Sequence, residues 1–364
     1  MQLKSLKLDN FRSYKNFNVD FKPGLNIFVG ENAQGKTNLL ESIYFCSIGK
    51  STRTAREKEL IRWGENKSKI NLQVQREFNK SKIEIVLCET CKKTIKINEI
   101  PIKRMGELMG ELLVIYFSPD EIRLIKDAPE DRRRFMDIDL SQMSKNYFYN
   151  LMRYEKILNQ RNKLLKTTKS REVLRESLSI WDEQLAVAAS KIIMSRIKFI
   201  ERLKGPANEV HRFITEDAES LALSYQSTII NSKEIAVCEE EIKQRLLKAY
   251  EASIARDFDL GYTTVGPHRD DIKVVINGVD IRSYGSQGQQ RLTTLSLKIA
   301  ELEIFKQDTG ETPVLLLDDV LSELDSHRQM RLLEKIKGIQ TLITCTSYPY
   351  EVGESGQIVK IVKE

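Results

Sequence analysis

The chain has 364 residues, of which 41% are hydrophobic and 30% are charged, and its formal net charge at pH 7 is +6. This length allows two domains with a sizeable core, and the composition is that of an ordinary soluble globular protein. The sequence holds no run of about 18 apolar residues, which excludes a hydrophobic membrane span. The mild positive charge permits a nucleic-acid partner but does not require one.

The first residues predict strands. Segments 3–8 and 17–21 alternate as the arms of a hairpin do, and the apolar run 25–29 is typical of a buried strand. The N-terminus lacks the apolar core of a signal peptide, and the five cysteines are scattered along the chain. We therefore expect a reducing, cytoplasmic environment.

Between the strand 25–29 and a predicted helix lies the pattern G-x-x-x-x-G-K-[ST], which is the P-loop. Its two glycines allow backbone N–H groups to turn inward toward phosphate oxygens, and the helix N-terminus adds partial positive charge. Lys36 is expected to reach the β- and γ-phosphates, and the Thr37 hydroxyl is expected to hold Mg²⁺. The phosphate-binding candidates are Gly30, Glu31, Asn32, Ala33, Gln34, Gly35, Lys36 and Thr37. The flanking strand and helix disfavour a glycine-rich turn that matches by chance.

Three segments with period-two alternation, 70–78, 82–87 and 94–97, predict a small antiparallel sheet. Cys88 and Cys91 form a single C-x-x-C between the second and third of them. A hairpin tip is favoured there over a zinc or redox pair, because the sequence has no second C-x-x-C. A further apolar strand is predicted at 112–117.

Residues 118–258 predict an inserted helical lobe. Helical periodicity covers 131–165, as one helix or two, 181–203, stopped by Gly205-Pro206, and 242–255, while 221–230 alternates weakly. A basic stripe runs through the first part of the lobe, and either phosphate binding or a solvated helix face explains it. Its members are Lys145, Arg153, Lys156, Arg161, Lys163, Lys166, Lys169 and Arg171, of which Lys163, Lys166 and Lys169 are the DNA-contact candidates.

The C-terminal part returns to alternating strands and helices. Residues 273–276 and 279–281, joined by Asn277-Gly278, predict a hairpin. Further predicted elements are helices at 289–306 and 332–336 and strands at 314–317, 341–344 and 357–362. Together with the strand before the P-loop, these strands predict one parallel sheet assembled from residues 1–117 and 259–364.

Two acids and a polar turn complete the candidate site. Asp318 and Asp319 end an apolar strand, as expected for the partners of a P-loop, with Asp318 for Mg²⁺ and Asp319 for orienting or deprotonating water. The turn with Ser286, Gly288 and Gln289 opens a helix and forms a second anion-binding terminus. Taken alone, this turn is also typical of a polar N-cap made by Ser286 and Gln289.

In their order, the P-loop, this turn, the acid-ended strand and the segment 321–325 resemble the ABC-type ATPase heads of SMC proteins. The turn then corresponds to the signature motif and the last segment to the D-loop. Four further stretches make nearly the whole chain similar to the RecF family of bacterial DNA replication and repair proteins. They are NFRSY (10–14), FSPD (117–120), PEDRRRFMD (129–137) and GPHRDD (266–271).

The resemblance implies an α/β fold: an ABC-ATPase head with a P-loop parallel sheet and an antiparallel β subdomain, plus the inserted helical lobe. The signature hairpin and helix are expected near 272–306. The resemblance further implies an ATP-dependent DNA-binding protein of recombinational repair and replication restart. Such proteins form a homodimer on ATP, act at gaps and at junctions of single- and double-stranded DNA, work with RecR and RecO to help load RecA, and support the SOS response.

The same resemblance assigns roles to single residues. Ser286, Gly288 and Gln289 would contact the γ-phosphate bound by the partner subunit. Arg12 would lie beside the nucleotide, and an exposed arginine in a turn is the other interpretation. His268 is a candidate catalyst, although a structural role in its Gly-Pro turn is favoured.

Three departures from general ABC ATPases favour slow hydrolysis in a switch rather than a motor. Asp319 stands where a glutamate is usual, residues 344–347 stand where a switch histidine is usual, and no clear Q-loop glutamine precedes Ser118. Three other classes stay open: the nucleotide-binding subunit of a transporter, a small-molecule P-loop kinase, and an architectural protein that never hydrolyses ATP. The insert offers no apolar docking surface for a transporter, and a kinase does not need the polar turn.

Overall fold

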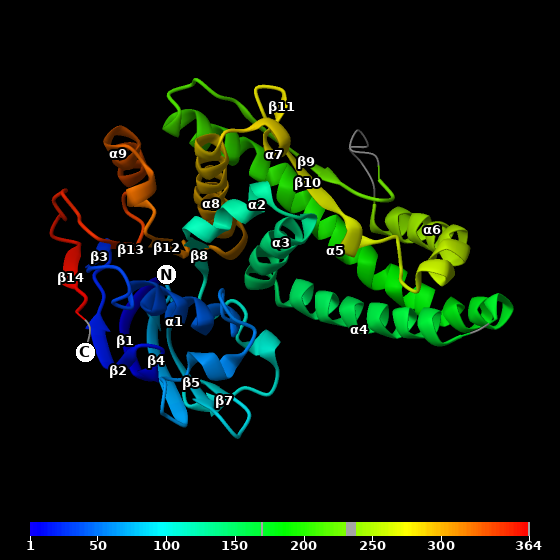
Figure 1. Cartoon of the computed structure of the whole chain (residues 1–364), viewed down its shortest axis with the longest axis horizontal. Helices are drawn as coiled ribbons and strands as arrows, with labels where there is room; N and C mark the ends of the chain where they lie inside the picture. The colour runs from blue at the N-terminus through cyan, green and yellow to red at the C-terminus, as the bar shows by residue number, and fades with distance from the viewer. Residues whose placement is uncertain (169, 231–237, 363–364) are drawn as a thin grey trace. The chain divides into compact units, whose positions relative to one another are not determined.

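The computed structural model describes residues 1–168, 170–230 and 238–362 (Figure 1). Contacts within the chain divide it into two compact units. Unit 1 comprises Met1–Glu121, Glu209–Glu219 and Arg291–Glu364, and unit 2 comprises Ile122–Asn208 and Ser220–Gln290. Among the described residues, no helix is both long and apolar enough to cross a membrane.

The core of unit 1 is a five-stranded parallel sheet in the order β14–β3–β13–β12–β8. Its strands are β3 (Leu25–Val29), β8 (Val114–Phe117), β12 (Val314–Asp318), β13 (Thr341–Cys345) and β14 (Gln357–Lys360). Every residue of β8, β12 and β13 is buried, as expected for parallel strands covered on both faces. Because the strands come from both ends of the chain, the predicted parallel sheet of two halves is confirmed.

A second sheet of unit 1 is antiparallel, in the order β2–β1–β4–β5–β6–β7. Its strands are β1 (Gln2–Phe11), β2 (Tyr14–Asp20), β4 (Lys67–Gln75), β5 (Lys80–Cys88), β6 (Thr94–Ile97) and β7 (Ile100–Pro101). Burial alternates along β4 and β5, which is the period of a sheet with one face on the core. The predicted hairpin and antiparallel sheet are therefore confirmed.

Helix α1 (Lys36–Ile48) contacts both sheets of unit 1, through β8, β12 and β13 on one side and β4 on the other. Its backbone turns into and out of the helix at Gly35 and Gly49, whose φ angles are 99° and 72°. Glycine adopts this left-handed conformation without strain. The remaining helices of unit 1 are α8 (Gln287–Thr309, from Arg291), α9 (Ser326–Lys335), η1 (Glu57–Leu60), η2 (Met105–Glu107) and η5 (Leu321–Glu323).

The tip of the β5–β6 hairpin carries the C-x-x-C pair. The antiparallel pairing of the two strands confirms the predicted hairpin. A disulfide joins Cys88 and Cys91, whose Cα atoms lie 5.3 Å apart. This bond was not predicted from the sequence, and it forms because the turn holds the two Cα atoms within bonding range.

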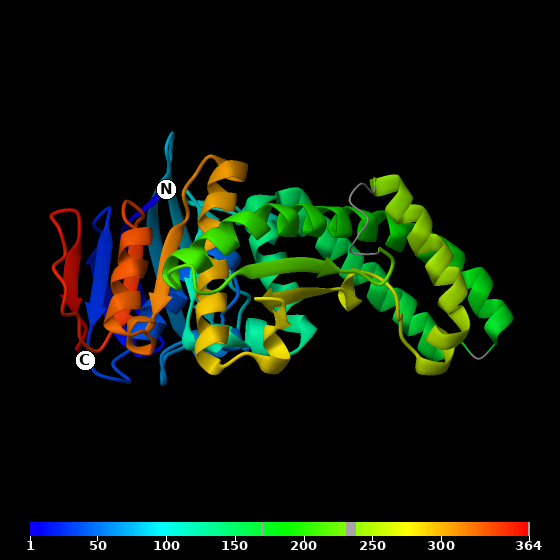
Figure 2. The same cartoon turned by 90° about the horizontal axis from the view of Figure 1, so that it is seen from above.

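Unit 2 is mainly helical. Its long helices are α3 (Pro129–Met143), α4 (Lys145–Thr167), α5 (Arg171–Ile214, to Asn208) and α6 (Glu239–Leu260), shown in green to yellow in Figure 2. Shorter elements are α2 (Arg123–Lys126), α7 (Ile281–Tyr284), η3 (Pro119–Ile122, which straddles the boundary) and η4 (Pro267–Arg269). The segment predicted as one helix or two forms two, because Ser144 ends α3 and caps α4 by accepting from the Tyr147 N–H.

One helix prediction was wrong. The helix expected to stop at Gly205-Pro206 continues through both residues to Ile214. A proline inside a helix costs roughly 3 kcal/mol, because its ring clashes and one hydrogen bond is lost. The helix persists because its apolar face stays buried across this point, with Leu203 and Ala207 fully buried on either side.

A three-stranded sheet in the order β11–β10–β9 belongs to unit 2. Its strands are β9 (Leu221–Gln226), β10 (Asp271–Ile276) and β11 (Val279–Asp280). The predicted hairpin is confirmed, with Asn277 and Gly278 both at positive φ, as a two-residue turn of type I′ requires. The weakly alternating segment 221–230 contains the third strand.

The two units differ from the predicted division in three places, the first being residues 118–121, which lie in unit 1. Residues 259–290 lie in unit 2, because β10 pairs along the whole length of β9. Residues 209–219 lie in unit 1, where His211 hydrogen-bonds Ser296 at 3.0 Å and Glu216 pairs with Arg331 at 3.0 Å. The insert is therefore not the continuous stretch 118–258 that we expected.

Candidate functional site

The P-loop lies between β3 and α1 at the carboxyl edge of the parallel sheet (Figure 1). Ala33 and Gly35 have positive φ, so the loop curls tightly, while Glu31 and Asn32 are exposed at its tip. A Cβ atom on Gly30 would lie 2.6 Å from the carbonyl oxygen of Ile361. Glycine is needed there because backbone approaches backbone.

Lys36 occupies the inside of this loop. Its ammonium donates to the Gly30 carbonyl and, at 3.0 Å, to the Glu31 carbonyl, and its side chain is largely buried. A lysine held by neutral carbonyl oxygens at a helix N-terminus is a cation without a carboxylate partner among these bonds. This is the electrostatic arrangement that attracts phosphate.

Asp318 receives hydrogen bonds from three neutral hydroxyls. Thr37 donates to its Oδ1 at 3.1 Å, Thr344 to Oδ1 at 2.6 Å and Tyr116 to Oδ2 at 3.2 Å. The positions of Thr344 and Tyr116 follow from strand order, since β12 lies between β13 and β8 in parallel register. Burial raises the pKa of Asp318, and the neighbouring Asp319 adds to that rise. The structure thus brings the predicted Thr37 and Asp318 into contact across 281 residues of sequence.

Asp319 has a strained backbone. Its φ is 51°, in the left-handed region, and its N–H donates to the Thr344 carbonyl at 3.1 Å. Its carboxylate Oδ1 is buried and has no hydrogen-bond partner within the described residues. Strain and an unsatisfied buried oxygen each cost free energy, and such costs concentrate at functional sites.

Arg12 lies against α1 rather than in open solvent. Its guanidinium binds both carboxylate oxygens of Glu41, at 2.8 and 3.0 Å, and the Glu59 carbonyl at 2.9 Å. Glu41 is fully buried on α1. The adjacent Tyr14 donates to the Gly35 carbonyl of the P-loop at 3.1 Å. Arg12 is therefore neither a freely exposed turn arginine nor an unpaired cation, and its contact with a nucleotide stays a prediction.

The predicted signature residues form a capping box at the start of α8, in unit 2. The Gln289 N–H donates to Ser286 Oγ at 3.2 Å, and the Ser286 N–H donates to Gln289 Oε1 at 3.0 Å. Ser286 and Gly288 are exposed, and Tyr284 beside them is 80% exposed. The N-cap interpretation describes this structure, and it leaves the helix N-terminus accessible to an anion.

Not every basic residue of the stripe on α4 is exposed, although the sequence indicates a continuous basic stripe. Arg161 is fully buried and binds Asp182 at 2.6 Å and Asp257 at 2.7 Å, so it cannot face a nucleic acid. Lys163 and Lys166 are exposed. The third predicted contact, Lys169, lies outside the described residues, and the side chain of Arg171 is not described.

Three residues of this site were not predicted from the sequence. Tyr116 and Thr344 are found only by aligning β8 and β13 with β12, since neither belongs to a motif. Glu41 looks like a surface position of an amphipathic helix until its burial is known. Strand register was the missing signal for the first two.

Comparison with known proteins agrees with the predicted resemblance. Residues 2–363 match the family model of the RecF/RecN/SMC N terminal domain. The DNA replication and repair protein RecF of Clostridium tetani is 48% identical over 347 residues, or 95% of this chain and 93% of that protein. The protein of the same description from Alkaliphilus oremlandii is 47% identical over 348 residues, with the same coverage.

The fold agrees as well. The solved structure of the recombination mediator protein RecF-ATP in the RecFOR pathway is similar with a TM-score of 0.90 and 39% sequence identity. The similarity covers 99% of this chain and 95% of that one. These matches leave the transporter subunit and the small-molecule kinase without support. A family model that spans nearly the whole chain, relatives close to half identical and a shared fold lead to one conclusion: the chain belongs to the RecF family.

Proposed function

We propose that this protein is an ATP-dependent DNA-binding protein of recombinational repair and replication restart. The observation that carries the proposal is the contact between Thr37 of the P-loop and Asp318 at the end of β12, at 3.1 Å. In P-loop ATPases this hydroxyl and this carboxylate hold Mg²⁺ on the nucleotide phosphates. The similar solved structure of RecF-ATP supports ATP as the nucleotide.

The donor set fits Mg²⁺. The described residues contain no group of three or more His, Cys, Asp or Glu side chains that could hold a metal by themselves. A P-loop site does not need one, because Mg²⁺ takes few protein oxygens and completes its shell with phosphate and water. The hydrogen-bond donors to Asp318 are all neutral hydroxyls, so a cation bound there would offset the free-energy cost of burying its carboxylate. Bound Mg²⁺ would supply charge neutralisation of the phosphates.

Hydrolysis depends in this proposal on Asp319. Its unbonded Oδ1 is the group available to orient or deprotonate the attacking water. Lys36 would leave its two carbonyl partners for the β- and γ-phosphates. Because Asp319 is shorter than the usual glutamate, we propose a slow ATPase that DNA stimulates, in which hydrolysis resets a switch.

We propose that ATP closes a homodimer. The accessible N-terminus of α8, with Ser286, Gly288 and Gln289, would bind the γ-phosphate held by the P-loop of the partner subunit. The capping box already fixes the conformation of this turn. In this arrangement neither copy has a complete site alone.

DNA contacts are proposed on one face of α4. Lys145, Lys156 and Lys163 are exposed and separated by intervals close to three and two helical turns, so they share a face with Lys166. Backbone phosphates, rather than bases, are the expected partners. By family membership we also propose action at DNA gaps with RecR and RecO in support of RecA loading and the SOS response, in the bacterial cytoplasm.

The proposal is tested by measuring the size of the protein in solution with and without ATP, and with gapped DNA. We expect ATP to shift the protein from monomer to dimer, and gapped DNA to join the dimer. Lys36→Met is the matched control: it keeps an unbranched side chain only one atom shorter and removes the charge, so it should fold but neither bind ATP tightly nor dimerise. A wild-type protein whose size ignores ATP, or a Lys36→Met variant that still dimerises, would overturn the proposal.

The DNA surface is tested in the same experiment by varying salt. On duplex DNA the slope of log affinity against log salt is near −0.9 for each neutralised phosphate. Reversing Lys163, Lys166 and Lys169 to Glu should weaken binding and flatten this slope. Reversal of the exposed Lys67 and Lys103 in unit 1 is the control, and an equal effect of both variants would contradict the assignment.

A further inference from the structure

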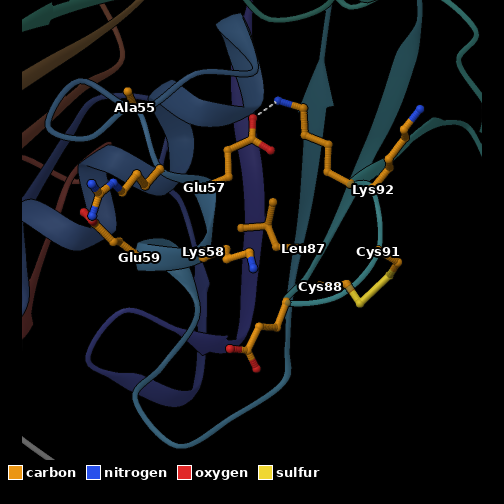
Figure 3. Close-up of a pocket in the computed structure, with 11 residues that line it drawn as sticks. Ala55, Glu57, Lys58, Glu59, Leu87, Cys88, Cys91 and Lys92 are labelled. Atoms are coloured by element: carbon orange, nitrogen blue, oxygen red, sulfur yellow. Dashed lines mark hydrogen bonds and ion pairs between the residues drawn. A yellow bond between two sulfur atoms is a disulfide. The ribbon is translucent and has the colours of Figure 1, made fainter.

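The disulfide at the β5–β6 tip borders a pocket with a volume of about 860 Å³. Figure 3 shows the pocket between two walls: one carries Glu57, Lys58 and Glu59, and the other carries the Cys88–Cys91 disulfide. The proposed ATPase and DNA-binding functions use neither the disulfide nor the pocket.

The sulfur atoms are accessible. Cys91 is exposed and Cys88 is half-buried, whereas Cys46 and Cys345 are buried free thiols elsewhere in unit 1. The Thr90 hydroxyl lies 3.7 Å from Cys88 Sγ. Attack on the exposed Cys91 sulfur would therefore release Cys88 as the leaving thiolate beside a hydrogen-bond donor.

The tip is tied to the helix that carries the P-loop. Lys93, two residues beyond Cys91, donates to the carbonyl of Gly49 at 2.6 Å, and Gly49 is the C-cap of α1. The Lys93 ammonium also lies 5.3 Å from the centre of the Phe45 ring on α1. A cation is favourable at a helix C-terminus because it opposes the partial negative charge there.

The opposite wall of the pocket leads to the same helix. Lys93 forms an ion pair with Glu57, and both residues line the pocket. Glu57 begins η1, and the Glu59 carbonyl of η1 accepts from Arg12 at 2.9 Å. Arg12 in turn binds Glu41 in the middle of α1. Both walls are thus fastened to α1, one at its end and one along its length.

We propose that Cys88 and Cys91 are a redox-active pair that exchanges with a dithiol reductant at this pocket, and that reduction weakens nucleotide binding by loosening the Lys93 cap of α1. The second half of this inference rests on the proposed function, because it requires ATP at the P-loop. The first half, thiol–disulfide exchange, stands independently of it.

Thiol–disulfide exchange at this pair has two steps. One thiolate of the dithiol attacks Cys91 Sγ, the Cys88–Cys91 bond breaks, and Cys88 leaves as a thiolate. In the mixed disulfide, the first sulfur of the reductant is bonded to Cys91. The second thiolate of the reductant attacks that first sulfur and releases Cys91 as a thiolate. The reductant becomes a disulfide, its two protons end on Cys88 and Cys91, and two electrons move to the protein.

Reduction would act on Lys93 through entropy. The intact disulfide restricts the turn that contains Lys93. The hydrogen bond from Lys93 to the Gly49 carbonyl therefore costs less conformational entropy in the oxidised protein than in the reduced one. A cation at a helix C-terminus changes the equilibrium constant for forming that helix by a factor of about two to five. We expect reduction to weaken ATP binding by about that factor.

The test uses the full chain with Cys238→Ser, which removes the exposed free thiol at the N-cap of α6. The protein is equilibrated with dithiothreitol in a series of reduced-to-oxidised ratios, and the thiols are counted by alkylation and mass. Hydrogen exchange of residues 45–50 and the Kd for ATP are then measured in both states. We expect two thiols to titrate together, exchange at 45–50 to rise on reduction, and ATP binding to weaken.

Two variants separate the parts of the inference. Cys88→Ser with Cys91→Ser should behave like the reduced protein in every buffer. Lys93→Met should retain the disulfide titration but lose its effect on residues 45–50 and on ATP. Failure of the pair to oxidise, stoichiometric zinc on the reduced thiols, or identical exchange at 45–50 in both states would each overturn the inference. Absence of ATP binding in both states would instead overturn the proposed function. The thiol titration and the hydrogen exchange would then still show whether Cys88 and Cys91 are redox-active.

Discussion

At the scale of single residues, Asp319 combines a left-handed backbone with a buried oxygen that lacks a partner in the described structure. Aspartate and asparagine adopt positive φ more readily than longer side chains do. The local backbone therefore gives a physical reason for an aspartate where ABC ATPases usually have glutamate. The Thr344 hydroxyl accepts from the Asp319 N–H at 3.0 Å and donates to Asp318 at 2.6 Å, so one side chain aligns both acids.

Replacing Asp319 by Asn separates these two properties. Asparagine tolerates the backbone and keeps the size of the side chain, but it loses the charge and basicity. We expect normal ATP binding and dimerisation, with hydrolysis slowed by roughly 10²-fold or more, as for removal of a general base. Single-turnover hydrolysis with and without DNA measures this, and an unchanged melting temperature is the control. Unchanged turnover would show that another group positions the water.

At the scale of elements, two of the four stretches that resemble the RecF family, PEDRRRFMD (129–137) and GPHRDD (266–271), are parts of one structural cluster in unit 2. Arg132 of α3 binds both carboxylate oxygens of Asp271, at 2.5 and 3.1 Å, and Arg133 donates to the Asp270 carbonyl at 3.0 Å. Arg196 of α5 donates to the Pro267 carbonyl at 2.6 Å. These bonds fasten α3 and α5 to the start of β10. The stretches therefore explain how the lobe is built rather than how ATP is cleaved.

His268 belongs to this cluster. Its Nε2 lies 3.0 Å from the Thr263 carbonyl, which can only accept, so Nε2 carries the proton and Nδ1 accepts from the Tyr154 hydroxyl at 2.6 Å. Burial lowers the pKa of His268 to about 4, and Arg269 and Arg133 contribute to the decrease. The favoured structural role fits this geometry, since both ring nitrogens are engaged within the lobe.

This pKa predicts a dependence of stability on pH. The unfolded chain binds a proton at His268 near pH 6.5, whereas the folded chain does so only near pH 4. Stability should be intact above pH 6.5 and fall by up to ~3 kcal/mol as the pH decreases from 6.5 to 4. Urea unfolding across this range measures it, and His268→Gln should flatten the decrease. An equal decrease in both proteins would assign it to other groups, such as His211, whose pKa burial also lowers.

At the scale of the whole molecule, the features that were predicted correctly are those determined by residues close together in the sequence. The P-loop, the buried strands and the Asn277-Gly278 turn are each set by neighbours in sequence. The pairing of β9 with β10, the passage of α5 through Pro206 and the burial of Arg161 were not predictable in this way. Each depends on residues distant in sequence, which compensate a proline or a buried charge only after folding. The same limit hid Tyr116 and Thr344, whose place beside Asp318 is a matter of strand register.

The dimer proposed for this molecule makes a prediction that no monomeric P-loop enzyme shares. Ser286→Arg puts a bulky cation where two subunits would meet, while the P-loop in the same chain is untouched. We expect this variant to fold and bind ATP but to lose ATP-dependent dimerisation and hydrolysis. Mixing it with Lys36→Met should restore part of the ATPase activity, because one of the two composite sites then has an intact P-loop and an intact turn. Activity of the mixture is compared with that of each variant alone at equal total concentration, using Ser286→Ala as the size control. A Ser286→Arg monomer that hydrolyses ATP at the normal rate would refute the shared site.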